Sequence, residues 1–396
     1  MTYETARGHD ERLNKEKIKF VNFISFFAGF SQAVLAYIIS SYFKERSGTE
    51  NVGLYFIIAY LAVFFILINF HKIIKKVGKS YAFLGTFLAQ TVSLLVLAVS
   101  PGSFWGIIFM IIYIVAVNLS VVGLDIILES FSVDKMSGRL RGLYLALLDA
   151  GFILGPLAST ITLGKYGFRG VFLFAFIINF FVFLLALKGL MNVNHRYNGR
   201  ATVKEIIKKI WQRKNVMRIY YISFILEAFY SIMIIFTPLY LRGLGLAWEQ
   251  IGFIFTVMLI PFLIFPYPAG FLADTKYGEK EMLIFALLTM GASTLLIYFI
   301  DTVNIFAWAA ILFSTRVGAA IIQTLRDSYF YKRVDGRDVD IIDFFRTSSS
   351  LAYVLSVVVA TVVLIFFPMK FIFIFLSILI FSGLYPLLKL ADNKPC

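Results

Sequence analysis

Three charged residues stand inside long apolar runs of the sequence: Asp149, Glu227 and Arg316. A charged group inside a bilayer costs at least about 2.5 to 3.5 kcal/mol, so the few that occur usually have a function. Glu227 lies nine residues into the run that starts at 218, and Arg316 lies about twelve residues into the run that starts at 304. At about 1.5 Å per residue, these positions are roughly 14 Å and 18 Å deep in a hydrocarbon core about 30 Å thick. We therefore expect Glu227 and Arg316 to face each other or a shared ligand.

Two interpretations of these charges remain open. Glu227 and Arg316 could bind a substrate or a proton, or they could form a static ion pair that orients two helices. Asp149 lies about eight residues into the run 141–163. It could take up and release a proton, as carboxylates in membrane proton relays do. The alternative for Asp149 is a salt bridge to Arg346.

Uncharged polar groups add few further candidates, and metal ligands are scarce. Gln32, beside Ser31 in the first apolar run, could hydrogen-bond either a ligand or a neighbouring helix. Cys396 is the one cysteine, and the three histidines fall in loops or at helix ends. We therefore expect no metal centre and no cofactor, and the sequence has no phosphate-binding loop that would indicate ATP hydrolysis.

The composition identifies the elements that must position these groups. Hydrophobic residues make up 60% of the 396, and charged residues only 15%, against about 25% in an average soluble domain. The mean hydropathy is +0.84. These values exclude a soluble globular protein and a disordered one, and indicate an integral membrane protein. At about 20 residues per helix, the sequence predicts twelve spans: 19–43, 52–72, 81–99, 104–130, 141–163, 170–190, 218–242, 250–273, 281–300, 304–330, 340–365 and 370–391.

The charge pattern predicts how the spans are oriented. Most of the 37 Lys and Arg residues lie in the terminal segment 1–18, in alternate loops and in the long middle loop. This bias predicts that these segments and both termini are cytoplasmic. We expect the membrane to be the plasma (inner) membrane. The net charge of +14 then reflects topology and attraction to anionic lipid rather than a nucleic-acid partner. Residues 203–213 of the middle loop alternate apolar and basic at helical spacing, which predicts a short amphipathic helix.

The two halves of the chain repeat each other at an offset of 198 to 200 residues. Glu129-Ser130 at the end of span four matches Asp327-Ser328 at the end of span ten, and Glu50-Asn51-Val52-Gly53 matches Glu249-Gln250-Ile251-Gly252. In this alignment Asn118 occupies the position of Arg316, which makes it a further candidate for ligand binding. Parallel six-helix repeats place a substrate cavity near the membrane midplane, between the halves.

At this point the sequence resembles the major facilitator superfamily of secondary transporters, across essentially the whole chain. Gly270-Phe271-Leu272-Ala273-Asp274, followed by Lys276, Gly278 and Lys280, resembles the family's cytoplasmic loop signature, with the second Gly one residue later than usual. The matching first-half loop, residues 70–79, has no Asp and no first Gly. Gly151-Phe152-Ile153-Leu154-Gly155-Pro156 resembles the G-x-x-x-G-P stretch of the family's antiporters. Glycines four apart allow close helix packing, and Pro156 bends its helix.

The resemblance also implies a cytoplasmic salt-bridge network that holds one conformational state shut, with simple solvation of the same charges as the alternative. Its expected members are Asp125, Glu129, Lys135, Asp274, Arg326, Asp327, Arg333, Arg337, Asp343 and Arg346. Pro261, Pro266 and Pro268 in span eight bend a helix suited to gating.

The sequence thus predicts an all-α membrane protein with the major facilitator fold. We expect a tail (1–18), a six-helix bundle (19–190), a linker (191–217), a second bundle (218–391) and a short tail (392–396). The resemblance implies a non-enzymatic transporter that works by alternating access, as a monomer in contact with lipids. Proton-coupled export of an amphipathic or hydrophobic compound is the first expectation. Uptake of a polar or anionic metabolite and a non-transporting receptor or scaffold are the alternatives.

Overall fold

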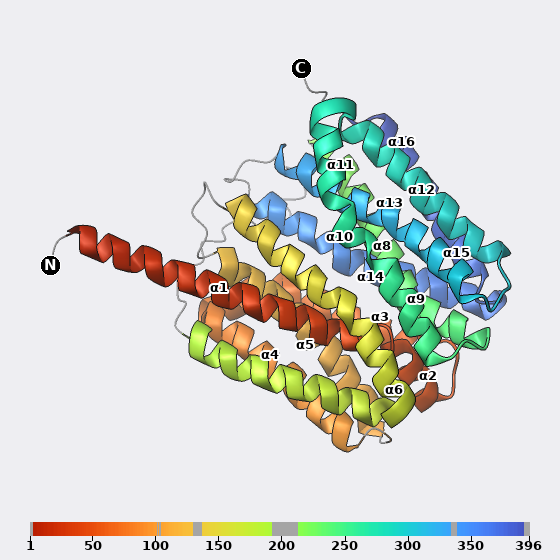
Figure 1. Cartoon of the computed structure of the whole chain (residues 1–396), viewed down its shortest axis with the longest axis horizontal. Coiled ribbons are helices and arrows are strands. Elements are labelled where there is room, and N and C mark those ends of the chain that lie inside the picture. Colours follow the sequence, from red (N-terminus) through yellow and green to blue (C-terminus); the bar gives the residue numbers. More distant parts are fainter. Residues whose placement is uncertain are drawn as a thin grey trace. The chain divides into compact units, whose positions relative to one another are not determined.

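The computed structural model describes residues 3–100, 102, 104–129, 137–191, 213–333 and 339–391, and every element in this part of the chain is a helix (Figure 1). The side chains of 3–17, 71, 104, 128–129, 137–146, 339–340, 342–344 and 346 lie outside the description. The amphipathic helix predicted over 203–213 falls largely outside the described residues.

Helices in the first half follow the predicted spans closely. Their bounds are α1 (Tyr3–Ala36), α2 (Ile39–Ser47), α3 (Gly53–Val77), α4 (Lys79–Val99), α5 (Phe104–Glu129) and α6 (Ser137–Leu190). The first span differs most from its prediction, because α1 already begins at Tyr3 and a turn at Tyr37–Ile38 separates it from α2.

The second half contains α8 (Lys214–Gly243), α9 (Trp248–Leu259), α10 (Pro261–Ile264), α11 (Pro266–Leu272), a π-helix η1 (Ala273–Tyr277), α12 (Glu279–Phe299), α13 (Ile305–Tyr331), α14 (Val339–Phe366), α15 (Phe371–Ser382) and α16 (Leu384–Leu388). Span eight is divided into α9, α10, α11 and η1. The breaks precede Pro261 and Pro266, since proline has no N–H to continue the helical hydrogen bonds.

Eleven of the described segments are long and apolar enough to cross a membrane. One of them, Leu147–Leu190, has 44 residues, about twice the length that a single span needs. It is interrupted at Gly167, whose φ of 62° and ψ of −168° are not helical. Spans five and six are therefore the two arms of α6, and the prediction of twelve spans is confirmed.

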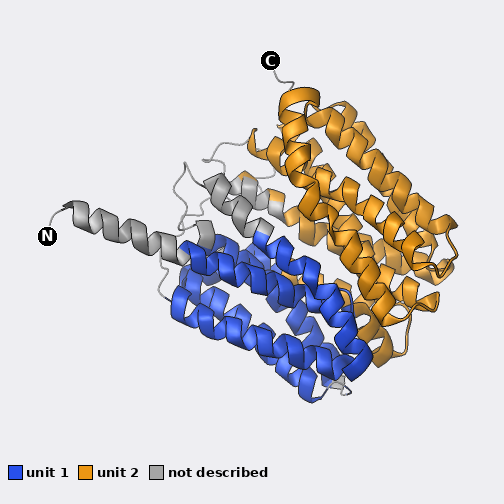
Figure 2. Ribbon diagram, viewed as in Figure 1, with its two compact units in different colours: residues 1–39, 65–197 blue, residues 40–64, 198–396 orange. Residues whose placement is uncertain are grey.

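The chain forms two compact units (Figure 2). Unit 1 comprises residues 1–39 and 65–197, and unit 2 comprises residues 40–64 and 198–396. Residues 40–43 at the end of the predicted first span and residues 52–64 of span two therefore cluster with unit 2.

Within unit 1, α6 packs against α1 at glycines. A Cβ at Gly151 would lie under 3.0 Å from the carbonyl oxygen of Phe26, and one at Gly155 would meet the Cβ of Ala33 as closely. Gly29 makes the reciprocal approach from α1 to the carbonyl of Leu148. The G-x-x-x-G spacing thus brings two backbones together, as expected where small residues line a membrane helix interface.

Within unit 2, segment 40–64 contacts α14. The Nδ2 of Asn51 donates a hydrogen bond of 3.1 Å to the carbonyl oxygen of Thr361. The rings of Tyr60 and Tyr353 lie 4.3 Å apart. A Cβ at Gly53 would collide with the side chain of Thr361. The Glu50-Asn51-Val52-Gly53 motif therefore forms a packing contact.

The turns before α4 and α12 have the same backbone conformation. Gly78 has φ 92° and ψ 157°, and Gly278 has φ 84° and ψ 158°, a region that is essentially restricted to glycine. The second-half loop holds one residue more than its counterpart, and the π-helix η1 absorbs it. The N–H of Gly278 bonds to the carbonyl of Ala273, five residues back, whereas that of Gly78 bonds to Ile74, four residues back. Most π-helices are single turns of this kind inside or at the end of an α-helix, and here the turn accommodates the inserted residue.

Candidate functional site

The most connected charged cluster of the described chain joins three helices of unit 2. Arg326 of α13 donates a hydrogen bond of 3.0 Å from Nη1 to Oε1 of Glu227 on α8. The other carboxylate oxygen of Glu227 accepts a bond of 3.1 Å from Ser349 on α14. The side chains of Glu227 and Arg326 are 15% and 12% exposed. Because the pair is largely shielded from solvent, it is screened less than a surface pair.

Hydroxyl groups extend this cluster along the seam between α8 and α14. Ser223 accepts a bond of 2.8 Å from Arg326 and lies 2.8 Å from Ser348. Two turns further along α8, Ser231 lies 2.5 Å from Ser356. Hydroxyls inside membrane bundles commonly bond neighbouring helices in this way, so the seam is held by polar contacts as well as by apolar packing.

Arg316 lies apart from this cluster, although it is on the same helix. It is 1% exposed, and its guanidinium carbon lies 4.7 Å from the centre of the Phe229 ring. Its Nη1 has no hydrogen-bond partner, and none of the described acidic side chains forms an ion pair with it. A buried guanidinium without a counter-charge is costly, and a cation–π contact repays only about 2 kcal/mol.

The predicted partner of Glu227 therefore differs from the observed one. Glu227 meets Arg326, ten residues beyond Arg316 on α13. Three residues further along α8, Tyr230 donates a bond of 2.7 Å to Gln323, three residues back on α13. Arg316 and Arg326 are ten residues apart on α13, so their backbones lie about 15 Å apart along the helix. The carboxylate of Glu227 bonds Arg326, and Glu227 and Arg316 do not form a pair.

Asp149, the third candidate, lies on α6 two residues before the glycine seam. It is partly buried, and none of the described side chains forms an ion pair with it. The side chain of Arg346, its predicted structural partner, is outside the description. Pro156 stands one residue after Gly155 inside α6, where its carbonyl accepts a bond of 2.8 Å from Thr160.

Of the polar candidates in the first half, Asn118 has a local partner. Asn118 bonds the carbonyl of Ile114 in its own helix, at 2.8 Å. Gln32 is partly buried. The conspicuous network is one that the sequence reasoning missed: Asn179 donates to Ser31 and accepts from Gln90, and Gln90 accepts from Ser120 at 3.1 Å. It joins α1, α4, α5 and α6 inside unit 1.

A second charged cluster lies where α12 begins and α13 ends. Lys332 donates bonds of 2.7 Å to Asp274 and 2.9 Å to Glu279. Ser328 donates a bond of 2.7 Å to Glu279, whose side chain is 2% exposed. Burial lowers the pKa of Lys332, but the hydrogen bonds and charges of the two carboxylates raise it more, so the net shift is upward. Lys332 and Glu279 were not predicted as members of the cluster, although they directly adjoin the predicted residues Arg333 and Gly278.

The remaining members of the predicted network have separate positions. Arg326 also bonds Asp327 at 3.2 Å, so a residue expected in the gate is shared with Glu227. Arg333 lies over the ring of Tyr329 and donates a bond of 3.3 Å to the carbonyl of Ala391. Asp125 is partly buried on α5. The side chains of Glu129, Lys135, Arg337, Asp343 and Arg346 lie outside the description.

Gly270 was predicted to allow close helix packing, but the structure shows no close contact at this glycine. A Cβ added to it would meet nothing within 4 Å. Gly278, by contrast, is required by its positive φ. Of the two glycines of the loop signature, Gly278 is needed for the backbone conformation of the turn, and Gly270 has space for a side chain.

Comparison with known proteins identifies the family to which this fold belongs. The chain is similar in structure to a mutant of the nucleoside transporter NupG, with a TM-score of 0.73 and 12% identity, over 94% of this chain and 99% of that one. No curated protein sequence matches the chain. Residues 21–339 match the family model described as Major Facilitator Superfamily. The chain, with its all-helical fold of twelve spans in two halves, therefore belongs to the Major Facilitator Superfamily of secondary transporters.

Proposed function

We propose that this transporter moves a small molecule that carries an anionic or strongly hydrogen-bond-accepting group, by alternating access, and that Arg316 binds that group. One observation carries the proposal: Arg316 is a buried guanidinium with an unpartnered Nη1 and no acidic counter-charge among the described side chains. An ionisable residue within a membrane span that only held helices together would be expected to have a protein partner.

The surroundings of Arg316 define the substrate further. Phe229 presents its ring face to the guanidinium at 4.7 Å, and the planar fork of an arginine suits a carboxylate or phosphate group. A substrate with an acceptor group and an apolar or aromatic body fits both side chains. This favours uptake of a polar or anionic metabolite over export of a purely hydrophobic compound. NupG transports nucleosides, so nucleosides belong among the compounds to be tested.

A binding screen tests this function. Purified protein would be screened by thermal shift against anionic metabolites, nucleosides and amphipathic drugs, and the strongest ligand would be followed by flux into proteoliposomes. Arg316→Met should weaken binding at least about tenfold, because the variant loses a charge-assisted contact with the substrate that is worth about 1.5 to 3 kcal/mol. Arg242→Met is the matched control, since Arg242 lies on α8 with its guanidinium over Trp248 and should leave binding unchanged. Equal affinity in Arg316→Met and wild type would refute the assignment.

Proton coupling through Asp149 is a second candidate, favoured by one observation. Asp149 is a partly buried carboxyl group beside the close contact of α1 and α6, and no described side chain neutralises it. Asp149→Asn should leave counterflow of labelled substrate intact and abolish accumulation driven by a pH gradient. If accumulation persists at the wild-type level, Asp149 does not couple transport to protons. Glu227→Gln would test the alternative coupling site in the same assay.

A further inference from the structure

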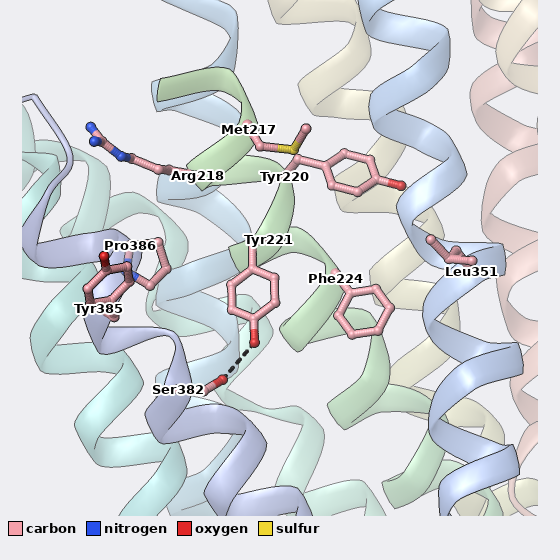
Figure 3. A pocket seen from close by; sticks show the side chains of 9 residues that line it. All are labelled: Met217, Arg218, Tyr220, Tyr221, Phe224, Leu351, Ser382, Tyr385 and Pro386. Carbon is pink, nitrogen blue, oxygen red and sulfur yellow. Dashed lines mark hydrogen bonds between the residues drawn. The ribbon is translucent and has the colours of Figure 1, made fainter. Parts of the chain in front are cut away.

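An apolar groove runs along the surface of unit 2, separate from the charged clusters. Its wider part is a cavity of about 550 Å³ between α8, α14 and α16. Figure 3 shows Met217, Tyr221 and Phe224 of α8 projecting into it, with Leu351 and Tyr385 on opposite sides. Tyr221 and Ser382 close it on one side through a hydrogen bond of 2.8 Å.

The groove continues deeper along the same helices. A second cavity of about 180 Å³ shares Phe224 and is lined by Leu355, Val359 and Val363 of α14 and by residues of α15 such as Phe375. Leu351, Leu355, Val359 and Val363 recur every four residues and so form one face of α14. From Leu351 to Val363 this face is about 18 Å long, which is close to the depth of one leaflet of a core about 30 Å thick.

Several side chains that flank the groove are exposed, as a lipid-facing surface requires, whereas Val363 at its inner end is buried. Leu355 is 46% exposed and Val359 is 52% exposed, and Tyr385 at the mouth is 67% exposed. Tyrosine at the mouth and aliphatic side chains further in match the distribution found where a protein crosses from the polar interface to the hydrocarbon.

Basic groups gather at the mouth. Arg218 donates hydrogen bonds to Asn215 and to the carbonyl of Lys389. The ammonium group of Lys389 lies over the ring of Tyr385, 4.0 Å from its centre. Lys214 is exposed at the first residue of α8. Three described acids near this end already have basic partners: Asp274 and Glu279 bond Lys332, and Asp327 bonds Arg326.

We propose that this groove binds one anionic phospholipid, with its phosphate at Arg218 and Lys389 and an acyl chain along α14 and α15. The charge at the mouth selects the occupant, because each basic residue at a membrane surface attracts an anionic lipid by about 1 kcal/mol. A zwitterionic lipid gains the same apolar contact and less of the electrostatic attraction. The proposal is independent of the substrate of transport, since neither Arg316 nor Asp149 takes part in it.

Native mass spectrometry of the intact protein in detergent tests the site. Wild-type protein titrated with phosphatidylglycerol should retain one lipid at a concentration about tenfold lower than with phosphatidylcholine of the same chains. Equal retention of the two lipids by the wild type would overturn the proposal without the need for any variant. Glycerophosphoglycerol, the headgroup without chains, should not compete; full competition would show a simple anion site and exclude the groove.

Variants separate the two ends of the groove. Arg218→Gln combined with Lys389→Gln should bring the affinities for the two lipids together, and Val359→Trp should fill the groove and weaken both. Lys370→Gln, at the opposite end of α15, is the matched control and should change neither. Unchanged retention of phosphatidylglycerol in Val359→Trp protein with a wild-type melting temperature would contradict the proposal. Lys389→Gln alone, on an exposed side chain, replaces the double variant if that fails to fold.

Discussion

Arg326 donates a hydrogen bond of 3.0 Å to Glu227 across the seam of α8 and α13, and both side chains are nearly buried. Ser349 completes the contact from α14. Three helices of unit 2 are therefore joined at one carboxylate. Such a pair can be a permanent structural contact or a contact that breaks during transport. The coupling energy between Glu227 and Arg326 distinguishes the two.

We expect a large coupling between these two residues. Glu227→Gln and Arg326→Gln should each destabilise the protein by about 3 kcal/mol, because each leaves an uncompensated charge in a low-dielectric seam. The double variant should lose markedly less than the sum, since neither charge is then left alone. Unfolding in mixed micelles of all four proteins gives the coupling energy.

The exposed pair of Lys44 and Glu50 provides the control for this cycle. Its N–O distance is 2.7 Å, but the side chains are 39% and 75% exposed. Surface pairs of this kind contribute about 0 to 1 kcal/mol. If the cycle for Glu227 and Arg326 gives a coupling as small as that for Lys44 and Glu50, the buried pair is not a structural strut.

The spans were predictable because apolar length is a local property of the sequence. The loop signature also located Gly278, and its displacement by one residue, visible in the sequence, matches the inserted residue that η1 absorbs. The break at Gly167 was visible too, since it lies between two apolar runs. These features depend on a few neighbouring residues and on the thickness of a bilayer.

The partners of the buried charges were not predictable in the same way. The depths of Glu227 and Arg316 were counted from opposite sides of the membrane, and the register of α8 against α13 depends on side-chain packing that a single sequence does not specify. An arginine side chain also reaches several ångströms from its backbone, so Arg326 at a helix end pairs with a residue deeper in α8. Lys332 was not predicted either, because its partners Asp274 and Glu279 lie more than 50 residues away in the sequence and meet it only in the folded chain.

Arg316 and Arg326 lie on one helix, and we expect opposite effects on stability when each is replaced by methionine. Arg316→Met removes a buried charge that has no counter-ion, so the melting temperature should stay the same or rise. Arg326→Met leaves Glu227 unpaired and should lower the melting temperature. Differential scanning fluorimetry of both variants in detergent measures this. A large loss of stability in Arg316→Met would mean that its contact with Phe229 has a structural role.

Gly155 should tolerate no side chain, although it lies inside a helix. Gly155→Ala would place a Cβ under 3.0 Å from Ala33 and from the backbone of Val34, so α1 and α6 must separate. We expect a loss of about 1 to 3 kcal/mol from overpacking. Gly85→Ala in α4 is the matched control: nothing lies within 4 Å, and alanine should stabilise the helix by up to about 1 kcal/mol. Chemical unfolding of both variants tests the pair, and equal effects would contradict the close approach.

The pKa of Lys332 predicts how the second charged cluster depends on pH. Burial lowers the pKa of Lys332, but the hydrogen bonds that Lys332 donates to Asp274 and Glu279, together with their charges, outweigh burial and raise the pKa above its ordinary value of 10.5. The stabilisation is therefore complete below the unfolded-state pKa of 10.5 and is lost as the pH rises through the higher folded-state value. Lys332 is 46% exposed, so screening limits the effect to about 1 kcal/mol.

Lys332→Met should accordingly be less stable than wild type at pH 7 and at pH 9, by the same amount. The difference should shrink towards zero as the pH rises well above 10.5, because the wild-type lysine then loses the charge that the variant lacks. Lys276→Met is the matched control: its ammonium group contacts the Tyr277 ring on η1, and no carboxylate bridge is lost. Thermal unfolding of the three proteins from pH 7 to pH 12 measures the effect. A difference between Lys332→Met and wild type that persists unchanged at pH 12 would show that the apolar stem of Lys332, and not its charge, holds α12 and α13 together.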